Sequence, residues 1–180
     1  MRISLRGTGD GVRISMRLEI NRRRWIALLI MLGVLTATGL VTGLWAVIAP
    51  ESFYDSYPGF GLRWVRADGP YNHHLAADVG AFFLALGAVS AAALYYRDSV
   101  IARVSGLGWL VFGLPHFLYH AFHRPDALSG LSYGLSLFAA LLLPALALAV
   151  LLVAPRERFP VPEPAPFTFK FPRRGNTDQR

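Results

Sequence analysis

Cysteine is absent from this chain of 180 residues, and charged side chains make up only 16% of it. Without cysteine the protein has no disulfide, thiolate zinc site, iron–sulfur cluster or cysteine nucleophile. Soluble domains average about 25% charged and about 45–50% apolar residues. Here 54% of the residues are hydrophobic and 13% are aromatic, which excludes a disordered chain and argues against an ordinary soluble domain. The composition therefore indicates a membrane protein.

Four apolar segments are long enough to cross a bilayer, which takes about 20 residues. They cover residues 25–48, 75–96, 104–122 and 131–154. The first segment is too long for the apolar part of a cleaved signal peptide, and Pro50 follows its only small-residue site at Ala49. We interpret it as a retained span. The sequence predicts an all-α fold, an integral membrane four-helix bundle formed by residues 25–154.

Positive charge is unevenly distributed between the two sides of this predicted bundle. Of the 18 Lys and Arg residues, 15 lie before the first span, after the fourth, or beside the link between the second and third. Because positive residues mark cytoplasmic loops, both termini are predicted to be cytoplasmic and the loop 49–74 to face outward. The strong preference for arginine over lysine is typical of a high-G+C bacterial genome, so the expected location is a bacterial inner membrane, crossed several times.

The two predicted cytoplasmic segments are a basic leader (residues 1–24) and a Pro-rich basic tail (residues 155–180). In the leader, residues 12–20 alternate apolar and polar side chains, as a strand or an interfacial segment would. In the tail, proline at every second position from 160 to 166 excludes a helix and predicts extended chain. The leader lacks the interleaved aromatics of a base-stacking surface, so its expected partner is the lipid bilayer and not nucleic acid.

The outward loop carries six aromatic residues, more than a flexible linker would. Pro58-Gly59 and Gly69-Pro70 predict turns within it. Aromatic side chains are favourable at headgroup depth, so one interpretation is a cap that lies in the membrane interface. A second, compatible interpretation is a lid over an outward-facing pocket, with Trp64 and Tyr71 as lid residues.

Every histidine of the chain is predicted to lie at the outer end of the bundle. His74 and Asp78 are four residues apart where the second span begins. On the third span, His120 lies about 40° from His116 around the helix and His123 about 20° to the other side, so the three share one face. Ionisable groups inside spans usually face the bundle interior or a polar cavity.

This His/Asp group permits several kinds of chemistry. It could be a hydrogen-bond network in which Asp78 pairs with His116 or His120, a site for a small polar ligand, or a proton relay. Imidazole and carboxylate also bind transition metals, and histidine can bind haem iron. The candidate metal ligands are His74, Asp78, His116 and His120. The candidate residues of a ligand site or polar network are His74, Asp78, Tyr119, His116, His120 and His123.

The sequence thus predicts a binding or accessory membrane protein with a polar site at its outer face. The alternative is a metal- or haem-dependent membrane oxidoreductase that uses the same residues, and the sequence leaves open whether the protein is an enzyme. Small residues support close helix packing or a homo-oligomer. They are Gly39 and Gly43; Ala77, Gly80, Ala81, Ala85 and Gly87; and Ser132, Ser136 and Ala140. Pro115 and Pro144 predict kinks in the last two spans.

The order of these parts resembles the DoxX-like superfamily of small bacterial membrane proteins. The resemblance covers residues 25–154 and rests on an outward loop, a second span that opens D-V-G-A-F-F-L-A-L-G-A (residues 78–88), and two further spans after a short basic link. It implies a four-helix membrane fold, and some members are tied to redox or sulfur-oxidising systems. The run P-H-F-L-Y-H-A-F-H at 115–123 is not part of that pattern.

Overall fold

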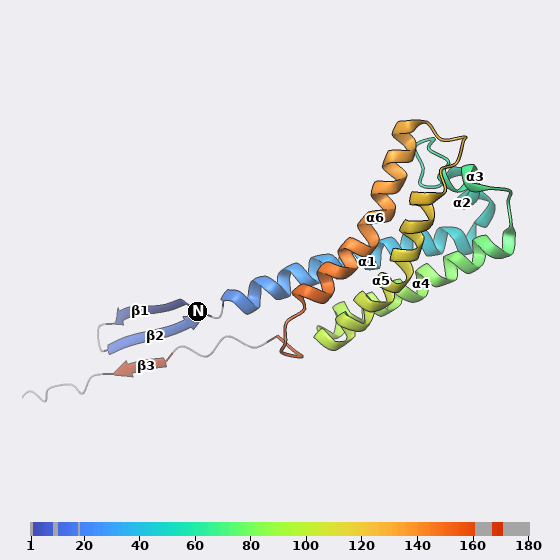
Figure 1. Ribbon diagram of the computed structural model, residues 1–180. Helices are drawn as coiled ribbons and strands as arrows, with labels where there is room; N and C mark the ends of the chain where they lie inside the picture. Colours follow the sequence, from blue (N-terminus) through green and yellow to red (C-terminus); the bar gives the residue numbers. More distant parts are fainter. Residues whose placement is uncertain (1, 9–10, 18, 161–166, 171–180) are drawn as a thin grey trace, which may run out of the picture.

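The computed structural model describes residues 2–8, 11–17, 19–160 and 167–170 (Figure 1). Its helices are α1 (Glu19–Ile48), α2 (Pro50–Ser56), α3 (Trp64–Asp68), α4 (His73–Tyr96), α5 (Ser99–Phe122) and α6 (Gly130–Val153). In this part of the chain four helices, α1, α4, α5 and α6, are long and apolar enough to cross a membrane. The prediction of four long apolar helices is confirmed.

All four long helices begin earlier than hydropathy predicted, and for two of them the difference is five residues or more. Helix α1 starts at Glu19 instead of residue 25, and α5 starts at Ser99 instead of 104. Arginine is a good helix former, so Arg22–Arg24 lower the hydropathy without ending the helix. Helix α5 has a capping residue: Asp98 accepts hydrogen bonds through Oδ1 from the backbone N–H groups of Val100 (2.8 Å) and Ile101 (3.4 Å).

The start of the tail is attached to this end of the bundle. Arg158 donates from Nε to Oδ2 of the buried Asp98 at 2.8 Å, and its carbonyl accepts the N–H of Ser99 at 2.9 Å. Burial opposes ionisation of Asp98, but the hydrogen bonds from Arg158 and from the backbone of α5 hold its pKa below its usual value. Arg103 donates to the carbonyl oxygens of Ala154 and Pro155. Residues 154–158 therefore lie alongside the first turns of α5.

A small antiparallel sheet stands beyond the N-terminal end of α1, so the described chain is mostly helical and not purely so (Figure 1). Its order is β1 (Arg2–Thr8), β2 (Gly11–Arg17) and β3 (Phe167–Lys170), with Leu5 opposite Ile14. The strand-like alternation of residues 12–20 is confirmed as far as Arg17. The proline run is described only at Pro160, since residues 161–166 lie outside the described chain.

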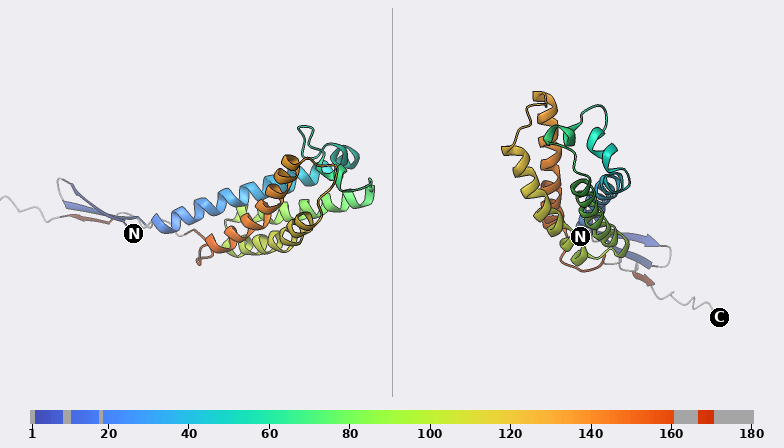
Figure 2. Two further views of the ribbon diagram at one scale, coloured as in Figure 1. Left: turned by 45° about the horizontal axis from the view of Figure 1, so that its top comes forward. Right: turned by 90° about the vertical axis from the view of Figure 1, so that its right-hand side faces the viewer.

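The long helices form two closely packed pairs, α1 with α4 and α5 with α6. In the first pair, Gly39 and Gly43 of α1 lie against the backbone of α4 near Gly87 and Gly80. In the second, Gly113 lies against Pro144, and neither Pro115 nor Pro144 ends its helix. Figures 1 and 2 show that the two pairs diverge toward the end that carries α2 and α3. This divergence makes room for a cavity.

Candidate functional site

A cavity of about 920 Å³ lies under the segment of residues 50–72, which we call the cap. All six helices contribute to its wall. Apolar side chains such as Val34, Phe83 and Leu146 line its inner part, and polar and aromatic groups line the part near the cap. Small-molecule sites usually have volumes of about 300–1,000 Å³ with apolar walls and a few placed polar groups, which is the pattern here.

The cap is held together by its own side chains. Tyr54 donates to the carbonyl of Gly69 at 2.8 Å, and Arg66 pairs with Asp55 at 3.0 Å. Between α2 and α3 the chain turns through Gly59 (φ 102°) and Gly61 (φ 77°), backbone angles that glycine adopts without the steric cost of a Cβ atom. The predicted turn at Pro58-Gly59 is confirmed, and the aromatic loop is a folded unit.

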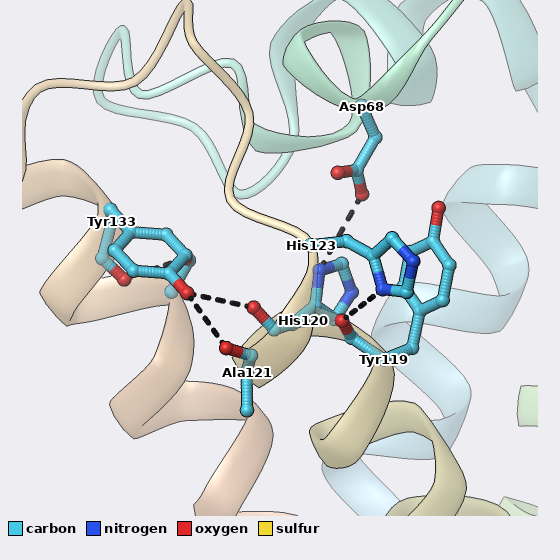
Figure 3. Close-up of polar contacts among 7 residues, drawn as sticks. Asp68, Tyr119, His120, Ala121, His123 and Tyr133 are labelled. Carbon is cyan, nitrogen blue, oxygen red and sulfur yellow. Dashed lines mark hydrogen bonds and ion pairs between the residues drawn. The ribbon is translucent and has the colours of Figure 1, made fainter.

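Two polar contacts join the cap to the α5–α6 pair. Trp64 Nε1 donates to Ser132 Oγ at 3.1 Å, and Asp68 Oδ2 lies 3.6 Å from His120 Nδ1 (Figure 3). The side chains of His120 and Asp68 are 22% and 29% exposed, so this ion pair is partly shielded from solvent. Burial raises the pKa of Asp68, while charge on His120 and His123 acts in the opposite direction.

Ring contacts position the side chains of His116 and His120 on α5 and of His123, which follows the last residue of that helix. The imidazole of His116 stacks on Phe112 (5.4 Å between centroids, 16° between planes) and lies edge-on to His120 at 4.7 Å. His123 stacks on Tyr119 at 4.4 Å, and its Nδ1 lies 3.0 Å from the Tyr119 carbonyl (Figure 3). Only His116, Tyr119 and His120 of this group line the cavity.

Tyr133 of α6 fixes the end of α5 that carries these histidines. Its hydroxyl lies 2.9 Å from the carbonyl oxygen of His120 and 3.4 Å from that of Ala121 (Figure 3). The last four carbonyls of a helix have no partner within the helix, so this contact satisfies groups that the bundle would otherwise leave unpaired. The position of His120 over the cavity therefore depends on α6 as well as on α5.

The predicted site residues lie in three places in the structure. Trp64, Tyr71, Tyr119, His116 and His120 line the cavity, and His123 stacks on Tyr119 without being a lining residue. His74 and Asp78 pair with each other on α4 at 3.4 Å, with side chains 87% and 52% exposed, and they are not among the cavity residues. For Asp78 the structure thus shows His74 as ion-pair partner, and for His120 it shows Asp68.

A resident metal does not fit this arrangement. Within the described residues, no group of three or more His, Cys, Asp or Glu side chains is placed to hold a metal ion. His116 and His120 are close to each other, but His74 and Asp78 form a separate exposed pair. The ligand set suggested by the sequence is therefore divided between two places, and we derive no chemistry from a metal.

The residue that sequence reasoning missed is Asp68. Its signal was an acidic side chain in an aromatic loop, directly before the Gly69-Pro70 turn. Helical spacing directed attention to Asp78 instead, because i,i+4 pairing can be read along one helix. The approach of Asp68 to His120 depends on how the cap folds over α5.

Comparison with known proteins adds no relative. The chain matches no protein-family model, and it matches neither a curated protein nor a solved structure. The resemblance to the DoxX-like superfamily stays an expectation, and the proposals below rest on the residues of this chain.

Proposed function

We propose that this chain is a multi-pass membrane protein that binds a lipid-like small molecule in the cavity under the cap. The single observation that supports this proposal is the distribution of side chains along the cavity. From Asn72, the N-cap residue of α4, to Phe83 on that helix, the lining residues extend about 16 Å along the helix axis at 1.5 Å per residue. The ionisable residues lie toward the cap, and the deeper lining is mostly apolar, with Thr38 of α1 as a polar exception at the level of Phe83. An amphiphile with its head at the cap and its chain between the helix pairs matches this distribution.

The proposed orientation places both termini in the bacterial cytoplasm and the cap outside. Its basis is the excess of Lys and Arg at the end that carries the leader, the tail and the α4–α5 link. In this orientation the cavity lies in the outer half of the bilayer, at the depth of the acyl chains of outer-leaflet lipids. The aromatic cap then lies at the level of the headgroups, where tyrosine and tryptophan are favoured.

A reporter enzyme that is active only outside the cytoplasmic membrane tests this orientation. Inserted at Gly61 in the cap, it is expected to be active, and fused after Arg180 it is expected to be inactive. A reporter active only in the cytoplasm should give the opposite pattern. Activity of the first reporter at Arg180, or at both positions, would contradict the proposed topology.

A cavity-filling substitution tests the binding site. Ala139 of α6 lines the cavity, whereas Ala145 on the same helix is exposed on the outer surface of the bundle. We expect Ala139→Phe to abolish saturable binding of 12-bromododecanol and Ala145→Phe to leave it unchanged. Binding is measured in maltoside micelles by quenching of tryptophan fluorescence, because Trp109 packs against Phe83 at the inner part of the cavity.

The Ala139→Phe and Ala145→Phe variants also provide the control for quenching by probe that is dissolved in the micelle and not bound to the protein. That background is common to the wild type and both variants, so only the saturable difference counts as binding. Quenching that rises without saturation in the wild type, or that is equally saturable in Ala139→Phe, would overturn the proposed site.

A further inference from the structure

The polar end of the cavity has one acidic side chain and two histidines, His116 and His120, and it has neither lysine nor arginine among the described lining residues. Asp68 is the only carboxylate among these described residues. The nearby Arg66 is paired with Asp55 and is not a lining residue. A headgroup with negative charge would thus meet a carboxylate and no permanent cation. Like charges placed together in a partly buried site are unfavourable.

Aromatic side chains line the same part of the cavity as this carboxylate. The cavity residues near the cap include Phe53, Tyr54, Tyr57, Trp64, Tyr71 and Tyr119. Phe53, Tyr57 and Trp64 form one group of ring contacts, and Tyr54 and Tyr71 form a second, with 5.2 Å between their centroids. The faces of tyrosine and tryptophan rings attract cations, and aromatic rings of this kind recognise ammonium groups in many proteins.

From the lone carboxylate and the aromatic side chains that line the same end of the cavity, we infer that the ligand carries a cationic head, an amine or a quaternary ammonium group. The inference rests on the proposed function and specifies its ligand class. The head binds between Asp68 and the cap aromatics, and the apolar chain extends toward Phe83. Nδ1 of His120 lies 3.6 Å from Oδ2 of Asp68, so the imidazole stands on the side of the carboxylate where a cationic head would bind. A bound ammonium group replaces His120 as the partner of the carboxylate.

Three brominated probes with the same twelve-carbon chain test this inference: 12-bromododecyltrimethylammonium, 12-bromododecanol and 12-bromododecyl sulfate. Binding is measured as above, at mildly alkaline pH so that Asp68 is ionised in spite of its raised pKa. We expect the ammonium probe to bind about tenfold more tightly than the alcohol, because it pairs with the Asp68 carboxylate and makes cation–π contacts that the alcohol lacks. The sulfate is expected to bind more weakly than the alcohol.

The matched variants are Asp68→Asn and Asp78→Asn. Both remove a carboxylate that pairs with a histidine, but Asp78 lies outside the cavity lining. Asp68→Asn is expected to abolish the preference for the ammonium probe, Asp68→Glu to retain most of it, and Asp78→Asn to leave it unchanged. Saturable alcohol binding in Asp68→Asn shows that this variant is folded.

The outcomes separate this inference from the proposed function. Saturable alcohol binding without a preference for the ammonium probe would overturn the cationic head and leave the binding site in place. A preference for the ammonium probe that persists in Asp68→Asn would also overturn the cationic head and leave the binding site in place. Absence of saturable binding for all three probes would overturn both.

Discussion

Replacing Gly39 with alanine is expected to separate α1 from α4 and to give the largest loss of stability among single-methyl additions in the bundle. A Cβ atom at this position would lie 2.6 Å from the Cα of Gly87 and 2.7 Å from the carbonyl oxygen of Phe83. Both neighbours are backbone atoms, so no side-chain rotation relieves the overlap. Overpacking of this kind typically costs about 1–3 kcal/mol, and a rigid backbone neighbour places Gly39→Ala toward the upper end.

Gly33→Ala on the same helix is the control for helix propensity. Within the described chain, no neighbouring atom lies within 4 Å of the position that its Cβ would take. Alanine favours a helix over glycine by about 0.5–1 kcal/mol, so Gly33→Ala is expected to be neutral or stabilising. Thermal unfolding in detergent, followed by circular dichroism, measures both variants. Equal effects at Gly33 and Gly39 would mean that α1 and α4 do not pack through these glycines.

Truncation of Trp109 to alanine is expected to destabilise the bundle by about 3 kcal/mol, within the range for large aromatic residues in cores. Its indole is fully buried and packs against Phe83 at 5.8 Å. Its Nε1 donates to Ser90 Oγ at 2.9 Å, and Ser90 lies 2.7 Å from Ser105 Oγ. The side chain therefore joins α4 and α5 by packing and by hydrogen bonding. In a bilayer the packing contribution of Trp109 to stability comes mainly from dispersion contacts, since lipid chains are as apolar as the core.

Trp109→Phe separates these two contributions. Phenylalanine keeps most of the ring contact but cannot donate to Ser90, which still has Ser105 and the Leu86 carbonyl as partners. We expect a cost of about 1 kcal/mol, the net contribution of one hydrogen bond. Chemical unfolding in mixed micelles measures both variants. A loss in Trp109→Phe as large as in Trp109→Ala would show that the polar contact, and not packing, carries the stability.

Hydropathy predicted the four long helices and their order because a membrane span has to be apolar over its whole length. The predicted ends agree best where a cap or a turn follows the apolar run, as at Ile48 and Tyr96. They agree least where arginine or a capping acid precedes it, as at Glu19 and Ser99. A hydropathy average does not distinguish a polar residue inside a helix from one that precedes it.

The pairing of the helices could not be read from the sequence in the same way. The chain offers two rows of small residues on the second span, and both have suitable spacing. In the structure Gly80 and Gly87 face α1, whereas Ala81 and Ala85 are exposed. In a soluble helix the polar face would indicate which row is outside. Here both faces are apolar, so periodicity does not distinguish the face that meets protein from the face that meets lipid.

The sheet and the site also combine features that the sequence determines with contacts that only the tertiary structure determines. The sequence by itself determined the alternation in β2, the shared face of His116 and His120, and an aromatic cap, because each depends on neighbours along one element. The pairing of β2 with β3 joins segments about 150 residues apart, and the contact of Asp68 with His120 joins the cap to α5. Only the tertiary structure decided these contacts. Sequence spacing carries the geometry of a single helix or strand, whereas the distance between two elements depends on how all the others pack around them.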